Sequence, residues 1–145
     1  MRIRRALLSD LPTIRRISER YRFERNRDWK ESISSKNREM FLLVENERIL
    51  GFTGLIYWDW NNTLQILDIF VIPKYREHGL GLKLVNFLIR KAKKTKYRCL
   101  IAEAPALSRA VGLYKKAGFR KCGYNDRYYA NGGKNIALWM SYDLK

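Results

Sequence analysis

The sequence has few of the residues that build metal centres, disulfide frameworks or membrane spans. It contains two cysteines, Cys99 and Cys122, and one histidine, His78, with no CxxC spacing. We therefore expect no metal site and two ordinary buried cysteines. No apolar run approaches the roughly 18 residues that cross a bilayer, and the amino-terminal segment lacks the apolar stretch of a signal peptide. These absences predict a cytoplasmic protein with no membrane partner.

Acidic residues are scarce relative to basic ones. The chain has 30 Lys and Arg against 14 Asp and Glu, a net charge of +16 in 145 residues. The basic residues recur between apolar positions in Arg2–Lys30, Lys83–Arg98 and Arg109–Lys121, which predicts a basic face on a folded domain. A polyanion such as RNA is one expected partner of this face, and a simple solvated surface is the alternative.

Low-complexity segments and internal repeats are absent, and a hydrophobic content of 46% suits a single domain over residues 1–145. Residue periodicity predicts strands at 1–7, 41–44, 49–60, 63–71, 97–104, 119–129 and 135–144, and helices at 11–22, capped by Ser9, 80–94 and 106–117. Residues 23–38 are the least regular and leave room for a short helix. We expect an α/β fold with a mixed sheet of about seven strands and about four helices: an antiparallel amino-terminal meander, a parallel βαβ pair and a carboxy-terminal hairpin.

Two glycines, Gly79 and Gly81, lie where the strand ending at Val71 leads into the helix that begins at Leu80. Glycines at a helix start let backbone N–H groups turn toward one point, and the helix dipole adds partial positive charge there. The pattern is not a Walker loop, and it is only half of a dinucleotide fingerprint. It indicates a phosphate-binding loop, with a glycine turn of no function as the alternative.

The run from Val71 to Gly81, V-I-P-K-Y-R-E-H-G-L-G, resembles the acetyl-CoA signature of the GNAT N-acetyltransferase superfamily at every defined position. A later group resembles its second signature: Ala110, Leu113, Tyr114, Gly118 and Phe119. The branch that acetylates protein N-termini, including the ribosomal-protein enzymes, is the most similar. Asp28-Trp29-Lys30-Glu31 and Tyr128-Tyr129 resemble segments of that branch. The resemblance covers essentially the whole chain and implies the GNAT fold.

Acetyl-CoA is the co-substrate that the resemblance implies, and no metal is expected. Its pantetheine arm would bind the backbone of three strand residues, Ile69, Phe70 and Val71. Its pyrophosphate would bind the loop amides of Glu77, His78, Gly79, Leu80, Gly81 and Leu82, with Arg76 beside them. Because these contacts use the backbone, the side chains of Glu77 and His78 need not matter.

Two catalytic residues are candidates by resemblance. Tyr114 occupies the family's general-acid position, and a phenol can protonate the departing thiolate, whose parent pKa is about 8.5. By spacing alone Tyr114 would be a core residue on one helix face with Leu107, Ala110 and Val111. Glu103 is the candidate base because it ends an apolar strand at the edge where α/β sites gather, and the ribosomal-protein enzymes carry Glu there. Asp68 and a water-relayed proton are the alternatives.

Two departures from the family pattern affect the site. Leu107 stands where many members carry an Asn that binds CoA, and the segment from Glu103 to Tyr114 is one residue shorter than in the ribosomal-protein enzymes. These departures leave the orientation of the Glu103 side chain open, whereas they hardly affect the prediction that the first loop binds the cofactor. Trp58, Trp60 and Trp139 are expected in the core or in a pocket wall.

The expected reaction is direct acetyl transfer in a ternary complex, with backbone donors near Ile69–Val71 stabilising the oxyanion. The acceptor is expected to be a protein N-terminal amine, presented near ribosomal RNA, because a +16 protein repels polyamines and aminoglycosides. Three alternatives stay open: a small-molecule acetyltransferase, an RNA-binding module and a non-catalytic acyl-CoA sensor. Either a monomer or a homodimer is compatible with the sequence.

Overall fold

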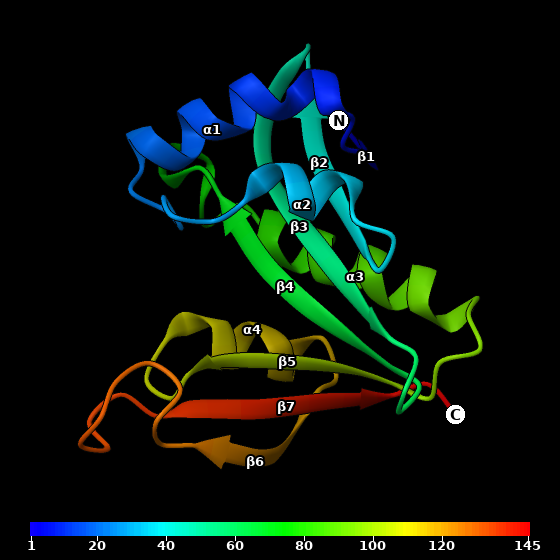
Figure 1. Ribbon diagram of the computed structural model, residues 1–145, viewed down its shortest axis with the longest axis vertical. Coiled ribbons are helices and arrows are strands. Elements are labelled where there is room, and N and C mark those ends of the chain that lie inside the picture. The colour runs from blue at the N-terminus through cyan, green and yellow to red at the C-terminus, as the bar shows by residue number, and fades with distance from the viewer.

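The computed structural model describes residues 1–145, and its centre is one seven-stranded mixed sheet (Figure 1). The strand order is β1-β2-β3-β4-β5-β7-β6. Only β4 and β5 are parallel, and every other neighbouring pair is antiparallel. The strands are β1 (Arg2–Arg5), β2 (Arg38–Glu45), β3 (Arg48–Trp58), β4 (Thr63–Val71), β5 (Cys99–Pro105), β6 (Arg120–Asn125) and β7 (Ala137–Asp143). The predicted α/β class, meander, parallel pair and hairpin are confirmed.

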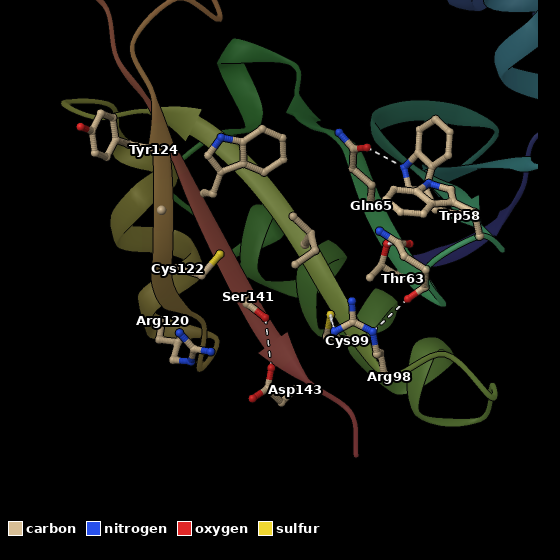
Figure 2. Close-up of a pocket in the computed structure, with 15 residues that line it drawn as sticks. Trp58, Thr63, Gln65, Arg98, Cys99, Arg120, Cys122, Tyr124, Ser141 and Asp143 are labelled. Carbon is tan, nitrogen blue, oxygen red and sulfur yellow. Dashed lines mark hydrogen bonds between the residues drawn. The ribbon is translucent and has the colours of Figure 1, made fainter.

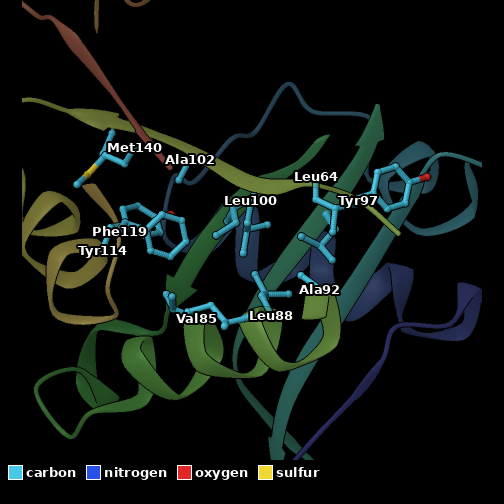
Figure 3. Close-up of a cluster of buried hydrophobic side chains, with 14 of the residues drawn as sticks. Leu64, Val85, Leu88, Ala92, Tyr97, Leu100, Ala102, Tyr114, Phe119 and Met140 are labelled. Atoms are coloured by element: carbon cyan, nitrogen blue, oxygen red, sulfur yellow. The ribbon is translucent and has the colours of Figure 1, made fainter. Parts of the chain in front are cut away.

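Four helices cover parts of the two sheet faces: α1 (Leu11–Arg20), α2 (Trp29–Ser34), α3 (Leu80–Lys93) and α4 (Arg109–Lys116). On one face, α3 and α4 bury a 16-residue cluster against the middle of the sheet (Figure 3). On the other face, α1 and α2 cover only the amino-terminal half, around Trp29, Phe52 and Phe70. The second face of β5, β7 and β6 therefore has no helix over it.

The short loops have the backbone conformations that their residues favour. Asn46 and Glu47 join β2 to β3 with φ of 49° and 65°, and Asn62 has φ of 57° before β4. Asn adopts this left-handed region more readily than most residues, which is why these positions are turns. Gly118, with φ of 106°, follows α4 and ends it as predicted.

Several predicted boundaries are wrong. Ser9 does not cap α1: the N-cap is Asp10, whose carboxylate accepts two hydrogen bonds of 2.9 Å from Arg4. The predicted helix over 106–117 begins only at Arg109, so Leu107 lies outside it and is fully exposed. Cys122 is exposed rather than buried, whereas Cys99 is buried as expected. For the first of these errors the structure shows the reason: Arg4 of β1 binds the Asp10 carboxylate, a tertiary contact that the local sequence pattern does not reveal.

None of the four helices combines the length and the apolar character that crossing a bilayer requires.

Candidate active site

The parallel strands β4 and β5 separate after three paired residues. Their register runs only from Thr63 opposite Cys99 to Gln65 opposite Ile101, although β4 continues to Val71 and β5 to Pro105. Figure 1 shows the two strands diverging from this point toward their carboxyl ends. The facing edges beyond Gln65 and Ile101 thus have no partner strand, and their backbone groups are available to an extended ligand.

A β-bulge in β4 changes the face toward which its residues point. From Thr53 to Leu55, two steps along β3 match three steps along β4, from Ile69 to Ile66. An extra residue in a strand reverses the alternation of side chains beyond it. Consequently Gln65 lines a hollow on the open face of the sheet, whereas Ile69 and Val71 line a groove on the α3 and α4 side.

That groove, here called the basic groove, has a volume of about 680 Å³. It contains three cations from two different segments: Arg76 from the loop, and Arg109 and Lys116 from α4. The full lining is Ile69, Val71, Arg76, Glu77, Gly79, Leu80, Gly81, Leu82, Arg109, Ala110, Leu113 and Lys116. An extended ligand that carries phosphates matches this shape and charge.

The loop before α3 is shaped by two residues in the left-handed region. Glu77 has φ of 65° and Gly79, the N-cap of α3, has φ of 77°. A Cβ on Gly79 would meet nothing within 4 Å, so its side is open, while a Cβ on Gly81 would lie 3.2 Å from Leu113 Cδ2 on α4. The first turn of α3 therefore presents its free N–H groups to the groove with little cover, as phosphate binding requires.

Arg76 is held in place from inside the fold. Its Nε donates a 2.7 Å hydrogen bond to the Val71 carbonyl, and its guanidinium lies 5.6 Å from the Phe70 ring centre. Arg109 closes part of the groove mouth by pairing with Glu77 at 3.0 Å. Both side chains of this pair are largely exposed, and the role of the Glu77 backbone in cofactor binding stays a prediction.

On the opposite face, Glu103 is partly buried and hydrogen-bonded by two neighbours. Gln65 Nε2 lies 3.1 and 3.0 Å from its two carboxylate oxygens, and the Tyr128 hydroxyl donates to Oε1 at 3.1 Å. Trp58 Nε1 donates to Gln65 Oε1 at 2.8 Å, which orients the Gln65 amide nitrogen toward Glu103. Burial raises the pKa of Glu103, and the charge of Asp68 raises it further, while the hydrogen bonds from Tyr128 and Gln65 lower it. The net shift of the pKa is upward, which brings it closer to the pKa that suits a general base.

Asp68 is more buried than Glu103, and it has an ion-pair partner. Arg27, from the segment between α1 and α2, forms a direct ion pair with its carboxylate. Burial raises the pKa of Asp68, and the Arg27 charge opposes that rise. Because Arg27 occupies this carboxylate, Asp68 is less available than Glu103 to accept a proton.

Tyr114 packs in the core beneath the separated strands, with 4% of its surface exposed (Figure 3). Its ring lies 5.2 Å from that of Phe119. Burial raises the pKa of its hydroxyl, and the charges of Glu103 and Asp68 raise it further, with no side-chain hydrogen bond contributing. The phenol therefore stays protonated at all ordinary pH values and its donor is not used by another side chain.

The structure brings most of the residues predicted from the sequence together, but two of the predicted cofactor residues do not line the groove. Of the ten predicted cofactor residues, eight line the basic groove. Phe70 is not among the lining residues because its ring packs in the core under α1 and α2. His78 is exposed, and its Nδ1 lies 2.7 Å from the Arg76 carbonyl oxygen.

Some residues of the site are not apparent from the sequence. Arg109 and Lys116 belong to the groove, Gln65 and Tyr128 hold Glu103, and Arg27 pairs with Asp68. The one signal for them in the sequence is the placement of Tyr128 in the Tyr-Tyr segment. The basic groove on one face and a partly buried carboxylate on the other form the class of site that a two-substrate group-transfer enzyme needs.

Comparison with known proteins identifies the class. Residues 2–119 match the acetyltransferase (GNAT) family, and the chain belongs to that family, whose members are acetyl-CoA-dependent N-acetyltransferases. A Bacillus subtilis protein, provisionally assigned as a ribosomal protein bS18-alanine N-acetyltransferase, is 29% identical over 104 residues, 70% of this chain and 68% of that protein. The streptothricin acetyltransferase of Streptomyces lavendulae is 29% identical over 118 residues, 79% of this chain but 62% of that protein.

The fold also has solved counterparts. The crystal structure of the Escherichia coli ribosomal-protein-S18-alanine N-acetyltransferase superposes with a TM-score of 0.79 at 23% identity, covering 99% of this chain and 94% of that one. This likeness supports the fold described above.

Proposed function

We propose that the protein acetylates the N-terminal α-amine of a protein, with Glu103 as the base, Tyr114 as the acid and the basic groove as the acetyl-CoA site. The observation that carries the proposal is the position of Glu103. It is a partly buried carboxylate of raised pKa, next to the separated strands and on the face opposite the glycine loop.

The residues of the basic groove fit acetyl-CoA. The uncovered amides of Gly79–Leu82 and the cations Arg76, Arg109 and Lys116 suit its phosphates. The unpaired edge at Ile69–Val71 suits the amide-containing pantetheine arm. When bound, acetyl-CoA supplies an activated acyl group. The residues of the basic groove would hold the cofactor, Glu103 would accept a proton from the amine and Tyr114 would donate one to the departing sulfur.

Gly81→Asp and Gly79→Asp are each expected to abolish stabilisation by acetyl-CoA. The new carboxylate would repel phosphates in the loop, and a Cβ at position 81 would also press on Leu113. A ligand at 100 times its Kd raises folding stability by about 2.7 kcal/mol, and this shift should disappear in a thermal melt. Gly112→Asp is the matched control, because it adds the same charge to an open position on α4 outside the groove. An unchanged shift in both loop variants would remove the cofactor assignment.

The α-amine is favoured over other amines by acidity. Its pKa is about 7.7–8.0, against about 10.4 for a lysine side chain. A carboxylate, even one whose pKa is raised by burial as in Glu103, therefore removes a proton from an α-amine far more easily than from a lysine side chain. The net charge of +16 also opposes polycationic acceptors and suits an acceptor presented near RNA.

The direct test measures thiol release from acetyl-CoA with a panel of amines. It should contain peptides with a free N-terminus, the same peptides blocked at the N-terminus but carrying lysine, spermidine and streptothricin. We expect turnover of the free α-amine peptides to exceed that of every other amine by at least about tenfold in kcat/KM. Because of the 29% identity to a streptothricin acetyltransferase, a small-molecule amine is the second candidate. Selective turnover of streptothricin would establish it instead.

A further inference from the structure

A second groove lies on the sheet face that no helix covers (Figure 2). It has a volume of about 720 Å³ and runs across β4, β5, β7 and β6. We call it the aromatic groove. Aromatic rings, two arginines and Gln65 are among its lining residues: Trp58, Trp60, Gln65, Arg98, Arg120 and Tyr124.

Large aromatic side chains are exposed around this groove. Trp60 is 82% exposed and Tyr124 is 69% exposed, while Trp58 and Trp139 are partly buried. Rings left in water at the rim of a hollow are typical of binding surfaces, because aromatic residues contribute much of the affinity at interfaces. The position of Trp60 in the β3–β4 turn serves no packing purpose in the core.

Two residues that line the aromatic groove also lie directly beside the proposed base. Gln65 lines the groove and hydrogen-bonds to Glu103, and Trp139 is the register partner of Glu103 on β7. Cys99 and Ile101 line the floor, and strand alternation places Glu103 on the same face. From Glu103 to Cys99 the strand covers about 13 Å, at about 3.3 Å per residue, which is the length of about four extended residues.

The charges of the groove are unbalanced toward the positive. Arg98 and Arg120 form no ion pair, and Arg98 is held in position by a 2.9 Å hydrogen bond from its Nε to the Asn61 carbonyl. The one lining carboxylate, Asp143, accepts a hydrogen bond from Ser141 at 3.1 Å. The two free guanidinium groups complement carboxylates on an occupant.

We propose that the aromatic groove binds the acceptor polypeptide beyond its acetylated amine and selects acidic residues about three to six positions from the N-terminus. The inference rests on the proposed function, because an occupant that begins at Glu103 presents an amine there. Rings and arginines also suit single-stranded RNA. Gln65 and Trp139, which line the groove beside Glu103, would serve no purpose for RNA, so a polypeptide is favoured.

The test compares three acceptors that share their first two residues: a dipeptide amide, a hexapeptide with Glu at positions 3–6 and a hexapeptide with Lys there. For the wild type we expect kcat/KM for the acidic hexapeptide to exceed that for each of the other two by at least about tenfold. In Arg98→Glu/Arg120→Glu, the ratio of kcat/KM for the acidic hexapeptide to that for the dipeptide should fall to about one or below. The kcat/KM for the lysine hexapeptide should rise in the same variant. Lys94→Glu/Lys121→Glu makes the same change in charge outside the groove and should keep the wild-type ratio.

The outcomes separate the two proposals. Turnover of the dipeptide with no preference among the three acceptors would overturn the groove assignment and leave the proposed function standing. Absence of turnover with every peptide would overturn both. A uridine octanucleotide that quenches tryptophan fluorescence in the wild type but not in the arginine variant, without any peptide preference, would assign the groove to RNA and overturn the inference. A wild-type dimer that dissociates in the arginine variant, with no preference among the peptides, would overturn the inference and assign the groove to a second copy of this chain.

Discussion

Tyr114→Phe is expected to lower turnover by roughly 100-fold or more, the usual scale for a positioned proton donor. The hydroxyl takes part in no side-chain hydrogen bond, and its pKa is raised by burial and by the nearby carboxylates Glu103 and Asp68. It therefore remains a donor at every pH of interest. Because its pKa lies above that of an ordinary thiol, its main contribution should be a hydrogen bond that strengthens as negative charge develops on the departing sulfur.

The fold should tolerate this change. The ring remains against Phe119, so stability should change by no more than about 1 kcal/mol, and affinity for acetyl-CoA should be nearly constant. Tyr142→Phe is a suitable control, because its ring also contacts Phe119, at 5.6 Å, and it is no part of the proposed site. The Tyr114→Phe defect should shrink with an acyl donor whose thiol has a lower pKa. Normal turnover with normal cofactor binding would make Tyr114 a core residue only.

Glu103→Gln is expected to reduce activity by roughly 100-fold at pH 6 and progressively less toward pH 9, where an α-amine with a pKa near 8 is already deprotonated. The pH profile of kcat/KM for wild type and variant measures this. Glu19→Gln makes the same chemical change at an exposed position on α1 and should leave the profile unchanged. An equal loss at every pH would indicate a positioning role for Glu103 and leave Asp68 or water as the base.

Although Glu103→Gln should lower activity, it should not lower the stability of the fold at high pH. Since the folded-state pKa of Glu103 lies above the unfolded value of 4.5, the native state binds the proton more tightly. The contribution of this proton binding to folding stability is full below pH 4.5, and it is lost as the pH rises through the folded-state pKa of Glu103. The amide introduced by Glu103→Gln carries no charge to desolvate, so at pH 8 the variant should melt no lower than the wild type. The difference between the two should vanish below pH 4.5. A variant that is less stable only at high pH would contradict the assigned direction.

The glycine loop before α3 and the general fold follow from local sequence. A glycine at the N-cap of α3 and a second glycine in its first turn have a conformational effect that depends little on the rest of the chain, so the local sequence is enough to identify Gly79 and Gly81. Strand alternation and the order of strands and helices likewise predict the parallel β4 and β5 pair. Helix starts are less predictable: the carboxylate of Asp10, the N-cap of α1, is bound by Arg4 of β1, a contact that the local pattern does not show.

Only the tertiary structure decided how the site is divided between the two faces of the sheet. One extra residue in β4 reverses the side-chain alternation after Ile66, and nothing in the run from Thr63 to Val71 marks where that bulge falls. The contacts of Glu103 are also nonlocal, with Gln65 38 positions away and Tyr128 25 positions away. The sequence by itself determined which residues could bind phosphate or exchange a proton, because that depends on local chemistry. That Arg27 pairs with Asp68 and not with Glu103 depended on packing between distant segments.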